Sequence, residues 1–334
     1  MRISSNQFYS QGVSSIQKHQ EEILNLQLQL STGKRVNNAS DDPVATSQIH
    51  ALKNTMAMID QYAENGSYAQ TQLEQEETAI SDITDSLQRA RVLAVQMSSG
   101  TYNAENRQAA AEEVGQLIDQ VKSMMNYTTS EGEKLFAGSS VKADSVFVED
   151  PTNPGYYAYI GSDNLIGEAE YDPQANYGAR FVQIGFDNDN VVKPDDNGDS
   201  SRVRTTDNGA KVFKVDGDSL PAGVDKNVLN VLVEFQNQLV AGTAPSDSVI
   251  DDIDSSIQQL SVVLTEVGGR QNRIESQSNA GESFKLSLEE RRQTLEDVDE
   301  VQGITDLTQT QNALEMAQLI FTRVQNLSLF NYLK

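Results

Sequence analysis

The chain contains no cysteine and no tryptophan, and only two of its 334 residues are histidine. The absence of cysteine excludes disulfide bonds, zinc–thiolate sites and thiol nucleophiles. Aromatic residues make up 6% of the chain and hydrophobic residues 37%. This composition is lean for a compact enzyme, but it is ordinary for long helices that pair through narrow apolar seams.

Long hydrophobic segments are also missing. No run approaches the roughly 18 apolar residues that a membrane-spanning helix needs. The first seven residues have neither an apolar core nor a small-residue cleavage site, so we expect no cleavable signal peptide.

Positive charge is scarce, because 49 acidic residues face 25 basic ones and the formal net charge is −24. Such a field repels nucleic acids and anionic membranes, so neither is an expected partner. Residues 1–42 and 300–334 together carry only −1, whereas residues 43–299 carry −23. The two ends are also rich in glutamine, whose uncharged amide costs less to desolvate than a carboxylate. These ends therefore favour packing among many copies, although helices that are simply soluble would have the same composition.

Proline and aromatic residues divide the chain. Residues 1–150 hold one of the seven prolines and residues 246–334 hold none. Between them, residues 141–221 combine prolines, Asn-Gly turns and short alternating runs, a pattern typical of strands and hairpins. We predict a mainly α fold, in which N- and C-terminal arms form a long antiparallel helical bundle or coiled coil around a β-rich insert. The predicted domains are a terminal coiled coil (1–42 with 300–334), a helical rod (43–140 with 222–299) and an outer insert (141–221).

Seven-residue spacings predict the faces on which the helices pack. In the rod, the repeat runs through Leu73, Ile80 and Leu87 and again through Leu260 and Val267. Each end of the chain shows one narrow seam, which needs a partner because a narrow seam does not stabilise an isolated helix. The simplest partner is the other end of the same chain. The two predicted assembly seams consist of Ile16, Ile23, Leu26 and Leu30, and of Leu307, Leu314, Ala317, Phe321 and Val324.

Candidate catalytic groups are few. His19 falls on the N-terminal seam, and His50 lies on a predicted helix that begins at Pro43, with Asp42 as its N-cap. Adjacent acids such as Glu76 and Glu77 point in different directions on a helix, so we expect solvated faces rather than acid–base pairs. No nucleotide-binding, hydrolase or metalloprotease motif is present, and we expect neither an enzyme nor a cofactor.

Two Asp-rich stretches, residues 187–190 and 195–199, invite a calcium-site interpretation. Neither fits the twelve-residue calcium loop, which alternates acids or amides before a Gly and a distal Glu. Turn chemistry accounts for them better, and we expect no metal.

Five sequence blocks closely resemble the flagellin family, and they occur in the family's order. They are LSTGKRVNNASDDP at 30–43, LQRARVLAVQ at 87–96, KLFAGS at 134–139, GRQNRIE at 269–275 and FTRVQNLSLFNYL at 321–333. The Asp42-Pro43 pair is more similar to the hook-associated members of the family than to flagellin itself. The resemblance covers residues 1–140 and 225–334, and it leaves the insert unmatched. Its motif residues are Asn37, Asp41, Asp42, Pro43, Arg89, Arg91, Asn272 and Arg323.

The resemblance implies a structural subunit of the bacterial flagellum at the hook–filament junction, outside the cell. Its implied partners are further copies of itself, hook-associated protein 1, flagellin and a flagellar export chaperone, and export would use the flagellar type III pathway. A first alternative is a flagellin subunit of the filament. A second alternative, of another class, is a calcium-binding or sugar-binding module housed in the insert.

Overall fold

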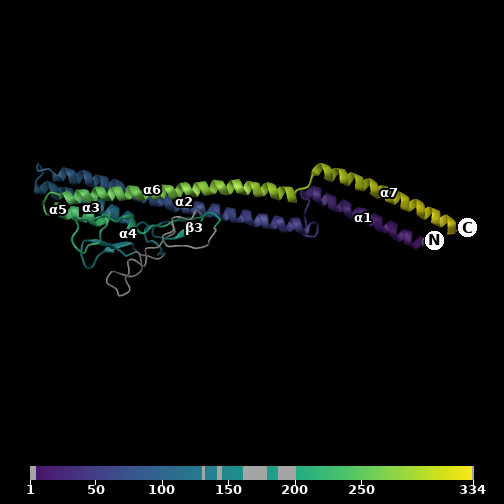
Figure 1. The fold of residues 1–334 in the computed structure, drawn as a ribbon, viewed down its shortest axis with the longest axis horizontal. Coiled ribbons are helices and arrows are strands. Elements are labelled where there is room, and N and C mark those ends of the chain that lie inside the picture. The colour runs from purple at the N-terminus through teal and green to yellow at the C-terminus, as the bar shows by residue number, and fades with distance from the viewer. Residues whose placement is uncertain (1–4, 130–131, 141–144, 161–178, 187–200, 333–334) are drawn as a thin grey trace. The chain divides into compact units, whose positions relative to one another are not determined.

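The computed structural model describes residues 5–129, 132–140, 145–160, 179–186 and 201–332. They divide into two compact units (Figure 1). Unit 1 comprises residues 1–58 and 283–334, and unit 2 comprises residues 59–282. The described residues are mainly helical, with two small antiparallel sheets, which confirms the predicted fold class. Among the described helices, none has both the length and the apolar character needed to cross a membrane.

Unit 1 contains α1 (Ser5–Thr32), α7 (Glu300–Tyr332), the first part of α2 (Pro43–Ser98) and the last part of α6 (Asp247–Glu296). Helix α1 ends at Thr32, and Gly33 follows with a φ of +70°, a left-handed conformation that favours glycine. Helix α2 begins at Pro43, and Asp42 caps it by accepting a hydrogen bond of 3.0 Å from the Ala45 amide. The predicted start of this helix is therefore confirmed.

The frame of unit 2 is an antiparallel pair formed by the rest of α2 and α6. Gln271 donates a hydrogen bond of 2.9 Å to Glu77, and further along the pair Arg91 donates one of 3.1 Å to Asp254. The predicted repeats face inward, because the following side chains are all at most 6% exposed: Leu73, Ile80, Leu87, Ile253, Leu260, Val267 and Ile274. Each fully buried aliphatic side chain of this kind contributes about 2 kcal/mol.

Two further helices, α3 (Ala104–Met125) and α5 (Val228–Val240), pack together inside unit 2. Asparagine side chains cap both at their N-termini, Asn103 for α3 and Asn227 for α5. Helix α5 is buried on most of its surface, including Leu229, Leu232 and Phe235. It therefore lies at the centre of the hydrophobic core.

The described part of the insert consists of two hairpins and a short helix. Strand β1 (Phe147–Glu149) pairs with β2 (Tyr157–Tyr159), and β3 (Phe181–Gln183) pairs with β4 (Arg202–Arg204); α4 (Gly209–Val212) follows. The rings of Phe136 and Phe147 pack edge-on against Phe213, with centroids 4.8 and 5.7 Å apart. These rings belong to the same hydrophobic cluster as α3 and α5. The insert thus shares a core with the helices of unit 2.

One expectation about the acidic residues is wrong. Glu76 is only 1% exposed, although adjacent acids on a helix are expected on solvated faces. It lies on the same face of α2 as Leu73 and Ile80, three and four residues away. The end of the insert, near Asp207, covers it. The candidate calcium stretches at 187–190 and 195–199 lie outside the described residues.

Candidate assembly interface

The two ends of the chain meet in unit 1. Helices α1 and α7 pack antiparallel, with both termini at the same end of the pair (Figure 1). The rings of Tyr9 and Phe321 are 5.3 Å apart, and a Cβ added to Gly12 would lie 2.8 Å from the Phe321 ring. Glycine at position 12 therefore allows the aromatic side chain to approach the backbone of α1 closely.

All nine side chains predicted as assembly seams lie half-buried on the face where α1 and α7 meet; we call this set the terminal seam. Its members are Ile16, Ile23, Leu26, Leu30, Leu307, Leu314, Ala317, Phe321 and Val324. His19 lies half-buried on the same face, 3.7 Å from the carboxylate of Glu22. The seam thus joins the two ends of one chain, and its role between copies stays a prediction.

A second set of apolar side chains lies exposed on the same two helices, and the heptad analysis does not find it. We call this set the outer stripe; it consists of Leu24, Leu28, Val301, Ile304, Met316, Leu319 and Ile320. Val301 is 77% exposed, Leu24 64% and Met316 63%. Helix α7 is therefore apolar on more than one side, which leaves it without a clear polar face. That weak periodicity, together with few charged residues, is the sequence signal for the outer stripe.

The residues 33–42, which we call the signature loop, connect α1 to α2. Asp41 accepts hydrogen bonds from the amides of Asn37 and Asn38, at 3.1 and 2.8 Å. The Asn37 side chain in turn donates to the Lys34 carbonyl at 3.0 Å. The hydrogen bond from the Ala45 amide lowers the pKa of Asp42, and the Arg35 guanidinium contributes to the same shift. These hydrogen bonds hold the shape of the loop.

The signature loop is fastened to the end of α6. The Arg35 amide donates to the Glu296 carbonyl at 2.7 Å, and its guanidinium donates to the Leu295 carbonyl at 2.9 Å. The buried Glu296 carboxylate accepts from Lys34 at 2.8 Å, from Lys53 at 3.2 Å and also from Arg292. Burial by itself would raise the pKa of Glu296, but the hydrogen bonds from Lys34, Arg292 and Lys53 lower it to about 2.

A pocket of about 430 Å³ opens beside this carboxylate. The signature loop forms one wall, and Thr46, Ile49, His50 and Lys53 of α2 form another. Within the described ranges, no three His, Cys, Asp or Glu side chains converge in a way that could hold a metal ion.

The remaining motif residues do not gather at one site. In unit 2, Arg89 pairs with Glu113 at 2.6 Å and Arg91 pairs with Asp254, so both arginines tie neighbouring helices together. Arg273 donates to the Arg202 carbonyl, and Asn272 beside it is exposed. Arg323 is exposed on α7 in unit 1.

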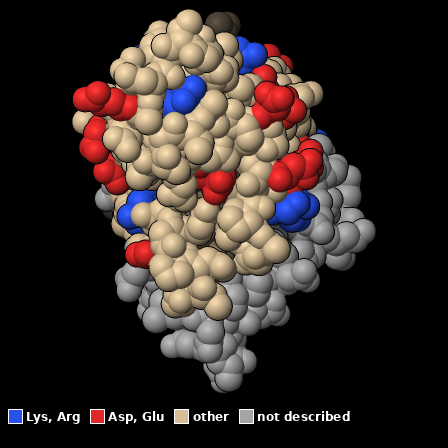
Figure 2. Space-filling view, turned by 90° about the vertical axis from the view of Figure 1, so that its left-hand side faces the viewer, with Lys and Arg blue, Asp and Glu red and all other residues tan. Residues whose placement is uncertain are grey.

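One end of unit 2 is unusually poor in charge. Residues 92–104 and 235–246 contain no Lys, Arg, Asp or Glu, and they include the exposed Val92, Val95 and Val240. The two segments meet where Arg107 and Gln108 donate to the carbonyls of Gly242 and Val240, both at 3.3 Å. Figure 2 looks onto this end, which we call the end face, and shows few charged residues in its middle and acidic residues along its sides.

Comparison with known proteins agrees with this arrangement. The model of the bacterial flagellin N-terminal helical region matches residues 3–141, and that of the C-terminal helical region matches residues 250–333. The chain is 29% identical over its whole length to the whole of flagellar hook-associated protein 3 from Escherichia coli (strain K12).

Solved structures share the fold. A putative flagellar hook-associated protein from Vibrio parahaemolyticus superposes with a TM-score of 0.57 at 20% identity, over 76% of this chain and 99% of that one. The flagellar junction protein FlgL from Legionella pneumophila gives a TM-score of 0.54 at 15% identity, over 74% of this chain and 100% of that one. The two family models flank the insert and together match about two thirds of the residues. The chain therefore belongs to the flagellin family, and it is a structural protein of the bacterial flagellum.

Proposed function

We propose that the protein is the structural subunit that joins the hook to the filament, and that its copies pack together through the outer stripe. The observation that carries this proposal is the exposure of the seven apolar side chains of the outer stripe beside an already paired seam. Exposed apolar side chains on both helices of this pair mark contacts with other proteins. Because residues 1–42 and 300–334 carry only −1 together, many copies can approach one another without strong repulsion.

The charge distribution supports a different position in the assembly for each part of the chain. The terminal parts, residues 1–42 and 300–334, would line the inside of the assembly, the rod would surround them, and the acidic insert, residues 141–221, would face outward. The end face of unit 2 offers a second surface that is poor in charge, suited to contact with the next subunit along the axis of the assembly. The terminal helices carry no catalytic constellation, and we assign the protein no enzymatic activity.

The similarity to hook-associated protein 3 and the sequence motifs support the proposed partners. One side of the assembly would bind a ring of hook-associated protein 1, and the other would present the surface on which flagellin polymerises. Before export through the flagellar type III pathway, a chaperone would cover the apolar faces of α1 and α7. The outer stripe is the kind of surface that such a chaperone masks.

Labelling and deletion in the source cell test this proposal. Immunogold labelling of isolated flagella should place the protein only at the boundary between hook and filament. Cells that lack the protein should make hooks and release unpolymerised flagellin into the medium. Labelling along the whole filament would instead identify the protein as a filament subunit, and deletion of a sole flagellin would leave none to be released.

A further inference from the structure

Among the described residues of unit 2, Glu76 has the most deeply buried carboxylate, and no described group donates a hydrogen bond to it. Its side chain is 1% exposed, and neither of its oxygens accepts a hydrogen bond from the described residues. An ionised carboxylate in such surroundings loses its hydration without compensation, at a cost of several kcal/mol by order of magnitude. The group that shares this buried space with Glu76 is another acid, Asp207, because both carboxylates lie close to the same Nη2 atom of Arg270. Two carboxylates form a hydrogen bond only when one of them carries a proton.

Asp207 is the acid that already has cationic partners. Its Oδ2 lies 2.6 Å from Nη2 of Arg270 on α6, and its Oδ1 lies 2.6 Å from Nε of Arg204 at the end of β4. The same Nη2 of Arg270 is 3.8 Å from Glu76, too far for a hydrogen bond. The ionised group of the pair is therefore Asp207, and the protonated group is Glu76.

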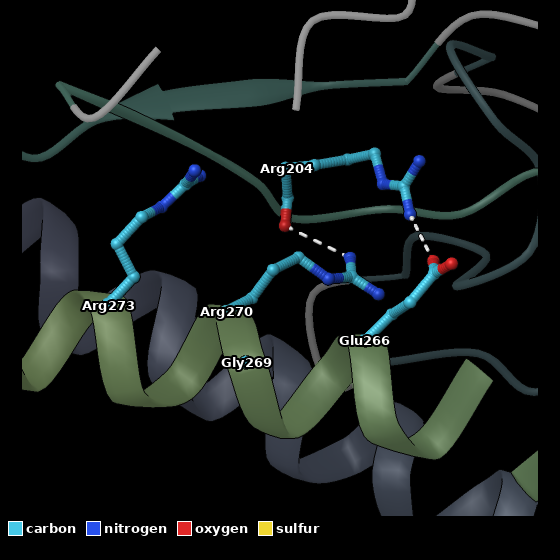
Figure 3. A pocket seen from close by; sticks show the side chains of 5 residues that line it. All are labelled: Arg204, Glu266, Gly269, Arg270 and Arg273. Carbon is cyan, nitrogen blue, oxygen red and sulfur yellow. Dashed lines mark hydrogen bonds and ion pairs between the residues drawn. The ribbon is translucent and has the colours of Figure 1, made fainter. Parts of the chain in front are cut away.

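The charges around the pair support the same assignment. Arg204 also reaches Glu266 of α6 at 3.6 Å, and Figure 3 shows Arg204, Arg270 and Glu266 gathered above α6. Arg204, Arg270 and Arg273 line the same pocket as Glu266, and Asp207 already pairs with two of these three guanidinium groups. Burial raises the pKa of Glu76 well above its ordinary value, and the charge of Asp207 raises it further.

Asp207 links the pair to the insert. Its amide donates to the Leu135 carbonyl at 3.3 Å, and its carbonyl accepts from the Gly138 amide at 3.1 Å. The neighbouring Thr206 hydroxyl donates to the Gly138 carbonyl at 2.8 Å. A hydrogen bond from Glu76 to Asp207 thus ties α2 to both chain segments where the insert begins and ends.

We propose that Glu76 and Asp207 form a proton-dependent latch between α2 and the insert, closed while Glu76 holds its proton and loosened when Glu76 ionises. In the closed state, the proton stays bonded to Glu76 and forms a hydrogen bond to the Asp207 carboxylate. When Glu76 loses that proton to the solvent, two like charges remain in contact. Stability at this site is therefore full at low pH and falls as the pH rises from the ordinary pKa of Glu toward the raised value.

Few other groups in unit 2 titrate in the same range. The chain has no cysteine, and both of its histidines, His19 and His50, belong to unit 1. A pH dependence of unit 2 above the ordinary pKa of Glu is therefore a specific signature of the latch.

The test uses the full chain and the substitution Glu76→Gln, which keeps the shape and a donor to Asp207 but cannot ionise. Amide hydrogen exchange, corrected for intrinsic rates, gives the opening constants of residues 135–138 and 205–209 from pH 5.5 to 8.5. In the wild type, these constants should rise by up to tenfold per pH unit. In Glu76→Gln they should stay constant, whereas the control Glu77→Gln, an exposed neighbour, should behave like the wild type.

Infrared spectroscopy gives a second, direct readout. The wild type at pH 7 should show the carbonyl band of a protonated carboxylic acid, which Glu76→Gln lacks. In Asp207→Asn, which also loses the arginine partners, the band should shift because its acceptor becomes an amide. Equal pH dependence in wild type and Glu76→Gln, or a wild type without the acid band at pH 7, would overturn the proposal.

Discussion

The face of α2 in unit 2 and the terminal seam in unit 1 follow the same seven-residue rule but are buried to different extents. Leu73, Ile80 and Leu87 are fully buried, because α3, α5 and the insert cover the groove between α2 and α6. Leu314 and its partners on α1 are only half-buried, because two helices alone cannot surround a side chain. Unit 2 therefore holds its own hydrophobic core, whereas the terminal pair leaves much of its burial to another molecule.

The largest effect of a single substitution is expected in unit 2. Leu87→Ala should lower the free energy of unfolding by about 3 kcal/mol, because the buried site cannot collapse onto the smaller side chain. Urea unfolding followed by circular dichroism measures this loss, with the exposed Gln88→Ala as a control. A loss below about 1 kcal/mol would show that the core of unit 2 is no tighter than the terminal seam.

The contacts of Lys34, Arg35 and Lys53 with the end of α6 at Glu296 form a clamp. Breaking this clamp should lower the local stability by an intermediate amount that depends on pH. The pKa of Glu296 is lowered to about 2, so its contribution is present above the ordinary pKa of Glu and is lost as the pH falls toward 2. Glu296→Gln should therefore destabilise residues 35–56 by about 2 kcal/mol at neutral pH and much less near pH 2.

Hydrogen exchange of these amides at several pH values measures the effect on the clamp. The exposed Glu290→Gln on the same helix is the matched control. A loss that is the same at pH 7 and pH 2.5 would mean that the charge of Glu296 does not fasten the loop.

A substitution in the terminal seam should lower the stability less than one in the core of unit 2. Leu314→Ala removes a half-buried side chain and should cost about 1 kcal/mol in the isolated chain. Since fraying ends open at little cost, this loss should remove most of the exchange protection of residues 305–320 without changing the unfolding of unit 2. Strong protection of these residues in the isolated variant would contradict the contrast between the two regions.

A substitution in the outer stripe should have the smallest effect on the stability of the isolated chain and a large effect on assembly. Leu319→Glu places a charge on a surface that is already exposed, so the unfolding of the monomer should change by less than about 0.5 kcal/mol. In cells, the variant should be exported yet fail to support filaments, because assembly would desolvate the carboxylate. Gln318→Glu adds the same charge outside the stripe and should leave motility intact.

The sequence pattern predicts which face of each helix packs, but it predicts less well how deeply the side chains on that face are buried. The spacing of Ile16, Ile23, Leu307 and Leu314 is enough to orient α1 and α7, because a helix buries the face that carries its apolar repeat. It does not reveal the outer stripe, since Met316 and Leu319 fall on the face that an amphipathic helix would keep polar.

The buried ionic groups lie beyond the reach of local pattern. The spacing from Leu73 and Ile80 places Glu76, but not Glu77, on the buried face of α2, yet nothing local shows which groups surround its carboxylate. Its environment depends on Asp207 and Arg270, which are far away in the sequence. The partners of Glu296 are equally hidden from local pattern. Lys34 and Lys53 meet this carboxylate only because α6 brings the chain back to them.

The pairing of Tyr9 with Phe321 brings together residues more than 300 positions apart in the chain. Closing a flexible loop of that length in one step would cost about 5 kcal/mol of conformational entropy, more than a half-buried seam returns. The Arg35–Glu296 clamp shortens that search, because Leu30 and Gly303 are already neighbours once it has formed. We therefore expect α1 and α7 to pair progressively from the signature loop toward the termini, so that the two chain ends are the last residues to meet.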